Sequence, residues 1–417
     1  MPTNTAYDLK SVKLPYLSGF ALKAFVALLE GPLGGLLIPS LLQSAGVTHL
    51  RRLNFDEAPT NFPIHHVTTP SAPDATIPVS EWSHSPSPRP GFRFASAMDY
   101  VAAYRSGAIS PETVAQQVLA AIESSNSAEP PLRAIIAVKP EEVLRLARES
   151  AQRYLEGLPR GPLDGVPVAV KDEVDMVPYP TTVGTAFLGQ APVTEDATVV
   201  ARFRAAGALL IGKANMHEIG IGVTGLNPHH GTVRNPYNPA HYTGGSSSGA
   251  AAAVAAGLCP IAIGADGGGS IRIPSAFCGV VGLKPTYGRV SEFGAAPLDW
   301  SIAHIGPLAA SAADAALGYA MMAGPDSKDA TSLLQPAPTL EGWYKPKIQG
   351  LRIGVFWDWF RHATAEVVAA CEALLKQFEG LGALLHEVVI PDLEAARVAH
   401  VITIATEMAQ AMDCFHA

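Results

Sequence analysis

Two glycine-flanked serine runs between Tyr242 and Arg289 constrain this chain more than any other feature. The first reads Gly-Gly-Ser-Ser-Ser-Gly over residues 244–249, and the second reads Gly-Gly-Gly-Ser over residues 267–270. Between them, the small-residue stretch 250–256 predicts a closely packed helix, and the apolar stretch 260–263 predicts a buried strand. Ser246 and Ser270, 24 positions apart (270 − 246), are therefore expected on loops at the ends of these elements.

Lys171 is a candidate base for these serines. The apolar strand expected over 166–170 places Lys171 at its carboxyl end, 75 positions before Ser246 (246 − 171). A serine hydroxyl is a poor nucleophile until a base takes its proton. A neutral lysine can be that base where burial disfavours its charged form, and a second serine can carry the proton. Glycines let backbone N–H groups turn toward a developing oxyanion, which is worth roughly 3–4 kcal/mol per donor.

The stretch from Lys171 to Arg289 resembles the core of the amidase signature family of serine hydrolases. The order Lys…Ser…Ser, both glycine-serine runs and the following Ile-Arg-Ile-Pro-Ser over residues 271–275 carry this resemblance. It implies that Lys171 is the base, that Ser246 bridges through a cis peptide, and that Ser270 attacks to form an acyl-enzyme. It also implies the following oxyanion donors: the N–H groups of Gly267, Gly268, Gly269 and Ser270. Asp266 and Arg272 are expected to pair and brace this loop.

Each motif alone has a more ordinary interpretation. A lone Gly-Gly-Ser is usually a flexible turn, and a lone Lys-Asp such as 171–172 is usually a solvated surface pair. A glycine-rich run before a helix can cradle phosphate, but the chain has no GxxxxGK[ST], and its GxGxxG match at 220–225 is soon followed by Pro228. The lysine and both serine runs in this order favour catalysis.

Composition narrows the class of protein. Of 417 residues, 48% are apolar and 16% are charged, which predicts a large core and excludes a disordered chain. The net charge of −8 and the lack of a basic stripe argue against nucleic acid as a partner. Four separated cysteines without a CxxC pattern suggest reduced thiols in a cytosolic setting. We expect no cofactor and no metal, because His229 and His230 lack zinc-site spacing.

Three regions are expected along the chain. Residues 1–55 form an apolar helical N-terminal extension, with an amphipathic helix over 18–30. Pro32 is expected to end this helix, and Gly34, Gly35 and Pro39 to interrupt the next apolar run over 33–42. The extension therefore has no unbroken apolar stretch of about 20 residues, and it shows no secretion signal. It is expected either to contact a membrane surface or to pack on its own domain or a second subunit. Residues 56–92 are a Pro/Ser-rich connector, and residues 93–417 are an amidase-type domain.

The remaining periodicity predicts alternating helices and strands, hence an α/β fold with a mixed central sheet. The resemblance implies the family's three-layer α/β/α sandwich, with the helical extension added. Helices are expected over 96–106, 111–124, 141–158, 197–206, 364–378 and near 401–412, and strands over 208–212, 351–356 and 386–390. Ser96 is a candidate N-cap for the first of these helices, and Ser110 is the expected N-cap of the second, with Pro111 at its first helical position.

The N-terminal half suggests a substrate. Residues 14–47, 100–106 and 212–218 resemble the plant-type fatty acid amide hydrolases within the family. This implies hydrolysis of N-acylethanolamines to fatty acid and amine, a membrane surface as a contact, a homodimer, and a place on the cytosolic face of endomembranes or the plasma membrane. Met216, Ile219 and Ile221 are candidates for an acyl channel, with core packing as the alternative.

The resemblance also implies that the family core continues beyond Ala417, so that further strands would be absent here. Three other functions fit the same residues: the amidase component of a tRNA-dependent amidotransferase, a short-amide amidase, and a non-catalytic amidase-like scaffold. The apolar extension counts against the first, and the complete Lys-Ser-Ser set counts against the last.

Overall fold

The computed structural model describes residues 7–10, 17–54, 95–335, 339–340 and 347–413. The chain divides into two compact units: 1–59 with 341–406, and 60–340 with 407–417. The connector expected over 56–92 lies wholly within positions 55–94, which are outside the described residues.

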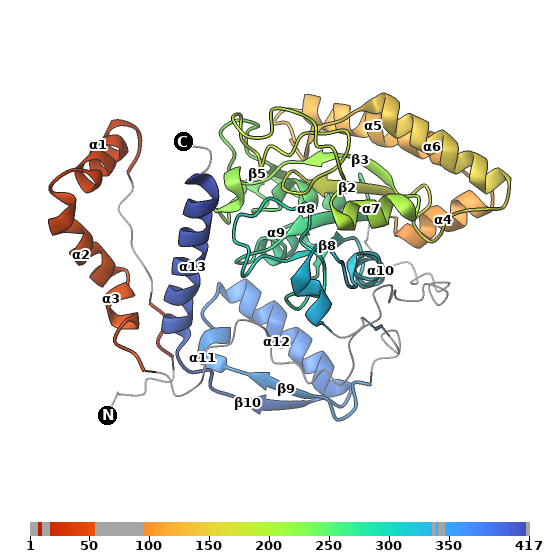
Figure 1. Cartoon of the computed structure of the whole chain (residues 1–417). Coiled ribbons are helices and arrows are strands. Elements are labelled where there is room, and N and C mark those ends of the chain that lie inside the picture. Colours follow the sequence, from red (N-terminus) through yellow and green to blue (C-terminus); the bar gives the residue numbers. More distant parts are fainter. Residues whose placement is uncertain (1–6, 11–16, 55–94, 336–338, 341–346, 414–417) are drawn as a thin grey trace. The chain divides into compact units, whose positions relative to one another are not determined.

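The larger unit is built on a six-stranded sheet (Figure 1). Its central strand β2 pairs in parallel with β3 and β6, whereas the β1–β3, β6–β8 and β7–β8 pairs are antiparallel. The predicted mixed sheet is therefore confirmed. In spatial order the strands are β1 (Ile135–Ala137), β3 (Leu209–Ala214), β2 (Pro167–Lys171), β6 (Ile261–Ala265), β8 (Ile305–Ala309) and β7 (Val281–Gly282).

The alternation of side chains along β6 defines the two faces of this sheet. Ala262 belongs to the core beneath α8 (Ser248–Ala255), and a Cβ on Gly264 would meet Ser247 just before that helix. Ile261 faces the opposite way, toward Gly318 in α10 (Ala312–Met322). Helices thus cover both faces, giving the three-layer α/β/α arrangement.

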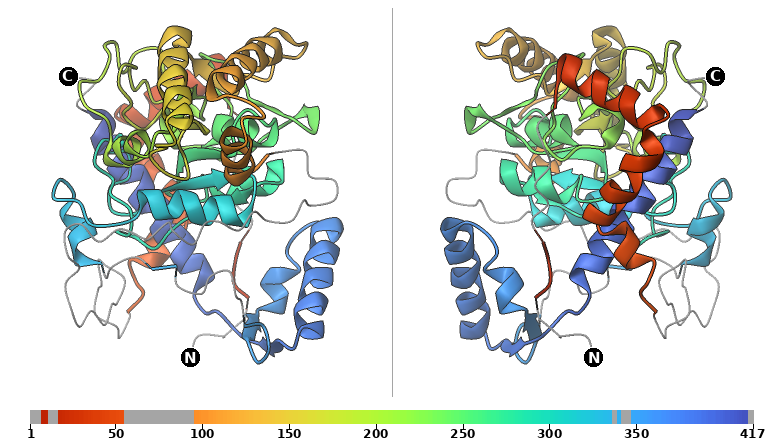
Figure 2. Two further views of the ribbon diagram at one scale, coloured as in Figure 1. Left: turned by 90° about the vertical axis from the view of Figure 1, so that its right-hand side faces the viewer. Right: turned by 90° about the vertical axis from the view of Figure 1, so that its left-hand side faces the viewer.

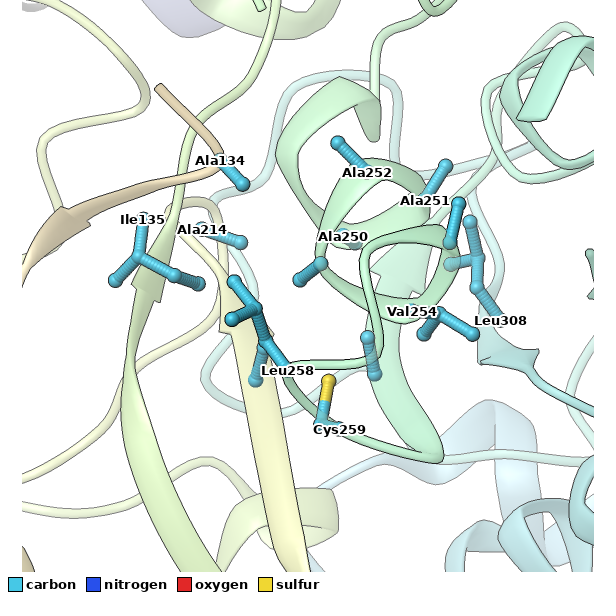
Figure 3. Packing of buried hydrophobic residues seen from close by; sticks show 14 of the residues in the cluster. Ala134, Ile135, Ala214, Ala250, Ala251, Ala252, Val254, Leu258, Cys259 and Leu308 are labelled. Atoms are coloured by element: carbon cyan, nitrogen blue, oxygen red, sulfur yellow. The ribbon is translucent and has the colours of Figure 1, made fainter. Parts of the chain in front are cut away.

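The buried helix α8 fits against the sheet because its side chains are small. Figure 3 shows its alanines packed beside Ala134 and Ile135 of the first strand region and Leu308 of β8. At its start, Gly249 lies so close to its neighbours that an added Cβ would be 2.3 Å from the Ala134 carbonyl oxygen and 2.4 Å from the Asn215 nitrogen. The short side chains therefore set how closely the helix approaches the sheet, and so where Ser246 lies.

The outer helices begin and end close to the sequence-based expectations. Ser96 caps α4 with a capping box completed by Asp99, and Ser110 caps α5 with Pro111 in its first turn, as predicted. The helices are α4 (Ala97–Arg105), α5 (Pro111–Ser127), α6 (Pro140–Leu155), α7 (Thr198–Ala205) and α9 (Arg272–Cys278), with short elements η1 (Glu218–Gly220), η2 (Ala330–Leu334), β4 (Arg234–Asn235) and β5 (Asn238–Tyr242).

The smaller unit contains a parallel pair of strands, β9 (Arg352–Val355) and β10 (Leu384–Glu387), with α12 (Ala365–Gly380) packed against β10 (Figure 2). The expected strand over 386–390 was placed too late, since pairing begins at Leu384. Short α11 is Trp357–Phe360, and α13 is Leu393–Asp413, the helix expected near 401–412, which passes from the smaller unit's residues into those of the larger unit.

The N-terminal helices of the smaller unit are apolar and largely exposed. They are α1 (Gly19–Glu30), α2 (Gly34–Ser44) and α3 (Val47–Leu50), and Pro39 is accommodated inside α2 rather than ending it. Phe20 is 86% exposed and Leu36 is 77% exposed. No single helix among the described residues is long and apolar enough to cross a membrane, although α1 and α2, joined at a 107° bend, pass that test as a pair (Figure 2).

Candidate active site

Lys171 ends β2 and lies on the same face of the sheet as Ala169, the face that α8 covers. Its side chain is 1% exposed. Its nitrogen Nζ donates to the Ser246 hydroxyl oxygen at 2.8 Å and to the Ala265 carbonyl oxygen at 3.3 Å. The structure therefore joins two residues that are 75 positions apart, because strand alternation and the start of α8 point them at each other.

Ser246 is held by its backbone as well as by the lysine. The Gly245–Ser246 peptide bond is cis, as the family resemblance implied. The Ser246 carbonyl oxygen accepts from the N–H groups of His217, at 3.1 Å, and Ser248, at 2.8 Å. The position of the hydroxyl is thus determined by the backbone on both sides.

The second serine run lies directly beside the first. Ser270 follows β6 and is buried, and its carbonyl oxygen accepts from the Ser247 N–H at 3.1 Å. The Ser247 hydroxyl donates to the Ala265 carbonyl oxygen at 3.0 Å. Lys171, Ser246 and Ser270 are consequently brought into one buried region, which strand and helix spacing alone did not guarantee.

Asp266 and Arg272 form the brace expected around Ser270. The Asp266 carboxylate accepts from the backbone N–H groups of Gly269 (2.7 Å), Ile271 (2.9 Å) and Arg272 (3.3 Å). It also accepts two bonds from the Arg272 guanidinium, at 3.0 and 2.8 Å. Burial alone would raise the pKa of Asp266, but the Arg272 and backbone hydrogen bonds outweigh it and hold that pKa at about 2.

The expected set of oxyanion donors needs one correction. Gly269 is not available as an oxyanion donor, because its single N–H group donates to the Asp266 carboxylate. The φ of Gly269 is +124°, in the region that favours glycine. Within the described part of the chain, the N–H groups of Gly268 and Ser270 donate to no protein acceptor. Gly267 lies against Asp299: an added Cβ would be 1.6 Å from a carboxylate oxygen of Asp299.

The acidic residue Glu173 is part of the site and was missed by the sequence reasoning. Its Oε2 atom lies 2.5 Å from Lys171 Nζ, and the residue is 5% exposed. The contact has the distance of an ion pair but not the angles of a hydrogen bond, so Oε2 has no hydrogen-bond partner. The Lys-Asp-Glu run that follows the apolar strand could have indicated Glu173, but the sequence analysis considered only Lys171 and Asp172.

A second buried lysine accounts for Asp172. Lys213 Nζ lies 3.4 Å from Asp172 Oδ1 and donates to the Val174 carbonyl oxygen at 2.6 Å. The interpretation of Lys171-Asp172 as a solvated surface pair is therefore wrong, since both residues are buried and each has a separate partner. Burial lowers the pKa of Lys213, opposed by the charge of Asp172.

A cavity of about 370 Å³ adjoins the lysine's environment and is lined by Glu173, Ala265, Glu292 and apolar residues of the 287–305 segment. Burial, reinforced by Asp329 and other carboxylates, raises the pKa of Glu292 to about 9. Burial and the neighbouring Glu173 likewise raise the pKa of Asp299 to about 7. Burial thus disfavours negative charge on Glu292 and Asp299.

The three candidates for an acyl channel differ in how deeply they are buried. Met216 is fully buried in a cluster with Val183 and Leu188, so core packing describes it better. Ile219 packs against the same cluster, whereas Ile221 is exposed. His229 lies in a loop, where its Nε2 pairs with Glu218 Oε1 at 2.7 Å.

This chain is similar to known amidases in sequence. The profile of the family described as Amidase matches residues 116–416. The fatty acid amide hydrolase of Arabidopsis thaliana is 39% identical over 429 residues, covering 96% of this chain and 70% of that protein. One component of the glutamyl-tRNA(Gln) amidotransferase of Symbiobacterium thermophilum is 40% identical over 306 residues, covering 73% of this chain and 62% of that protein.

This chain is also similar to amidases of known structure. The native peptide amidase from Stenotrophomonas maltophilia superposes with a TM-score of 0.70 at 32% identity, covering 78% of this chain and 69% of that chain. The similarity thus extends from the sequence motifs to the arrangement of the sheet and its covering helices.

Proposed function

Because this chain belongs to the amidase signature family and is an amide-hydrolysing enzyme, we propose that it cleaves fatty acid amides of the N-acylethanolamine type. The products are a free fatty acid and an amine, formed through a Ser-Ser-Lys triad and an acyl-enzyme.

The buried hydrogen bond from Lys171 to Ser246 is the observation that carries the chemistry. In the first step neutral Lys171 takes the proton of Ser246, Ser246 takes the proton of Ser270, and the Ser270 oxygen bonds to the substrate carbonyl carbon. The negative charge that develops on the carbonyl oxygen is received by the glycine-run N–H groups, with Gly268 and Ser270 as donors.

Proton return completes the cycle. Lys171, now an ammonium, gives its proton through Ser246 to the leaving nitrogen, and the carbon–nitrogen bond breaks. Water then attacks the acyl-enzyme with the same relay acting as base, and the fatty acid leaves. Because the leaving nitrogen is protonated as it departs, amides are accessible to this site as well as esters.

The extent of the match supports the lipid substrate. A match over 96% of 417 residues leaves out at most about 17 of them (417 × 0.04), so it includes most of the extension over residues 1–55. The match to the amidotransferase component covers 73% of the chain. The apolar extension is therefore a feature in common with the fatty acid amide hydrolases.

The exposed faces of α1 and α2 support a membrane contact. Phe20, Leu33 and Leu36 are more than half exposed, and apolar surface of this kind suits the boundary between headgroups and acyl chains. A substrate with a long acyl chain resides in a bilayer, so we place the enzyme on the cytosolic face of endomembranes or the plasma membrane. A homodimer that covers part of this surface is compatible with such docking.

The test combines labelling with turnover. A fluorophosphonate probe should label the purified chain at Ser270. Labelling should be lost in Ser270→Ala and Lys171→Ala and retained in the exposed control Ser106→Ala. N-acylethanolamine should be hydrolysed in parallel. Labelling without hydrolysis of any long-chain amide would refute the substrate, and a folded but unlabelled protein would refute the triad.

Competing substrates identify the alternatives. Glutamine, a peptide amide and a short-chain amide are compared with the N-acylethanolamine at equal concentration. A higher kcat/KM for the long-chain amide supports the proposal. Preference for glutamine would instead indicate an amidotransferase-like activity, and preference for the short amide a general amidase.

A further inference from the structure

We propose that Asp299 is a positioning residue for the oxyanion site, because its carboxyl group packs against Gly267 and so keeps the N–H group of Gly268 aimed at the substrate carbonyl oxygen. This role rests on the proposed function, since the oxyanion forms only when Ser270 attacks a carbonyl carbon. Asp299 lies outside both serine runs, and none of the motifs in the sequence indicated it.

The carboxyl group of Asp299 occupies the space beside the α-carbon of Gly267. A Cβ added to Gly267 would lie 1.6 Å from Oδ2 of Asp299, 2.8 Å from its Cγ and 3.3 Å from its Oδ1, and these are the three nearest atoms outside the adjacent residues. The φ of Gly267 is not in the positive region, so its backbone would accept an alanine. The Asp299 side chain is therefore the group that restricts this position to glycine.

Two carboxyl groups thus hold the residues on either side of Gly268. Asp266 accepts from the Gly269 N–H at 2.7 Å, and Asp299 packs against Gly267. Glycine has the largest backbone freedom of any residue, so a run of three glycines does not keep its N–H groups aimed without support. An oxyanion donor contributes most when it is aimed before the charge develops. Contacts at both ends of the run supply that preorganisation.

Asp299 belongs to a turn that is itself held in place. Its carbonyl oxygen accepts from the N–H groups of Ile302, at 3.0 Å, and Ala303, at 2.8 Å. The preceding residue, Leu298, is 2% exposed and belongs to a buried cluster with Met408 of α13. Asp299 itself is 7% exposed. Its carboxyl group is therefore presented to the glycine run from a fixed backbone.

The sheet fixes the distance between this turn and the glycine run. β8 begins just after the turn and pairs with β6, where Ile305 faces Ala265. Beyond that pair, the Asp266 N–H donates to the His304 carbonyl oxygen at 2.8 Å. The glycine run starts at the residue after Asp266, so the backbone hydrogen bonds between β6 and β8 bring Asp299 to it.

The surroundings of Asp299 favour its neutral form. Burial, followed by the charge of Glu173, raises the pKa of Asp299 to about 7. Lys171 acts against this shift, whereas Glu407 and Asp266 add to it. The group is therefore largely neutral below pH 7, and a neutral carboxyl group supports the glycine run without repelling an oxyanion. Asparagine has nearly the same shape and no charge, so it is the conservative replacement.

The main experiment compares the wild type, Asp299→Ala and Asp299→Asn at pH 7 in fluorophosphonate labelling of Ser270 and in N-acylethanolamine hydrolysis. Asp299→Ala removes the contact, so its labelling rate constant and its kcat should fall about tenfold, whereas KM should change by less than about twofold. Asp299→Asn keeps the contact and should retain both rates within about threefold. An asparagine variant as impaired as the alanine variant would overturn the inference.

Inhibitor binding distinguishes oxyanion support from general packing. With a long-chain trifluoromethyl ketone, the Ser270 oxygen bonds to the ketone carbon, the Ser270 proton passes to the Ser246–Lys171 relay, and the ketone oxygen takes the negative charge. The corresponding secondary alcohol binds without forming this oxyanion. The inhibition constant of the ketone should rise about tenfold in Asp299→Ala, and that of the alcohol should stay the same. Equal increases for both inhibitors, or no increase for either, would contradict the proposal.

Asp99→Ala is the matched control for a general loss of stability. Asp99 completes the capping box of α4, so its replacement should lower the urea midpoint without changing the inhibition constant of the ketone. If Asp299→Ala fails to fold, Asp299→Ser takes its place, because serine is also too short to fill the space beside Gly267.

A urea cycle tests the contact without requiring activity. Gly267→Ala places a Cβ in the carboxyl group of Asp299 and should be strongly destabilised, whereas Gly267→Ala combined with Asp299→Ala should be more stable than Gly267→Ala alone, because the clash is gone. A double variant without this recovery would rule out the contact and the role. A folded wild type that is not labelled at Ser270 would refute the triad and this role together, whereas a labelled wild type with an unaffected Asp299→Ala would refute the role alone.

Discussion

Replacement of Asp266 by asparagine tests whether the loop that carries Ser270 depends on a buried charge. The carboxylate accepts five hydrogen bonds, two of them from Arg272, and its pKa lies at about 2 against an ordinary value of 3.8. At about 1.36 kcal/mol for each pKa unit, the charged form contributes about 2 kcal/mol to stability. Asp266→Asn should cost at least this much, because its NH₂ group would face donors.

Urea denaturation at several pH values measures this contribution. A carboxyl group with a depressed folded-state pKa stabilises the protein above its unfolded-state value and loses that contribution as pH falls toward the folded-state value. The difference between wild type and Asp266→Asn should therefore be constant from pH 5 to 8, at about 2 kcal/mol, and shrink below pH 4 toward about pH 2. Labelling of Ser270 should also fall at least tenfold, because the loop loses its brace.

Glu112→Gln is the control for charge removal at an exposed ion pair, with Arg148 at 3.0 Å, and should change stability by less than about 1 kcal/mol. The reasoning would be refuted by an Asp266→Asn protein as stable as the wild type at pH 7. It would equally be refuted by a stability difference that persists unchanged at pH 3.

Three further predictions follow from packing and charge. Gly249→Ala should destabilise the protein by more than about 2 kcal/mol, because its Cβ would lie 2.3–2.7 Å from three backbone atoms, whereas Gly35→Ala, with nothing within 4 Å, should change the urea midpoint little. Glu292→Gln should raise the melting temperature at pH 8 and not at pH 4: a carboxyl group whose folded-state pKa is raised to about 9 loses stability as pH rises from its ordinary value of 4.5 through that folded-state value. An equal effect at both pH values would contradict this. Phe20→Glu with Leu36→Glu should reduce co-sedimentation with phospholipid vesicles while leaving Ser270 labelling unchanged, and Leu155→Glu, at an exposed apolar residue of the larger unit, should not reduce it.

The sequence determined the local elements well where the physical signal is local. Ser96 and Ser110 were expected to begin helices because a serine side chain satisfies an unpaired N–H of the first turn, and both do. The strand end that carries Lys171 followed from a short apolar run. Pro39 shows the limit of such rules, since α2 continues through it.

Charge placement was decided only by the tertiary structure. The sequence presents Lys171, Asp172 and Glu173 as neighbours, and nothing in it indicates that Lys213 takes Asp172 while Glu173 turns to Lys171. That division arises because Lys213 on β3 pairs with Val170 and not with Lys171, so the two lysines lie at the same end of neighbouring parallel strands and point to opposite faces of the sheet. Likewise, the N–H direction of Gly269 depends on the Asp266 carboxylate, which folds back across the loop.

By itself, therefore, the sequence determined the fold class, the family and the lysine and serines that belong to the candidate site, because those depend on residue type and order. The tertiary structure decided which groups surround them: Glu173 beside Lys171, the Asp266 carboxylate that takes the Gly269 N–H, and the cavity next to Glu173. These depend on distances between residues far apart in the chain, and burial makes such electrostatic interactions strong only after the chain has folded.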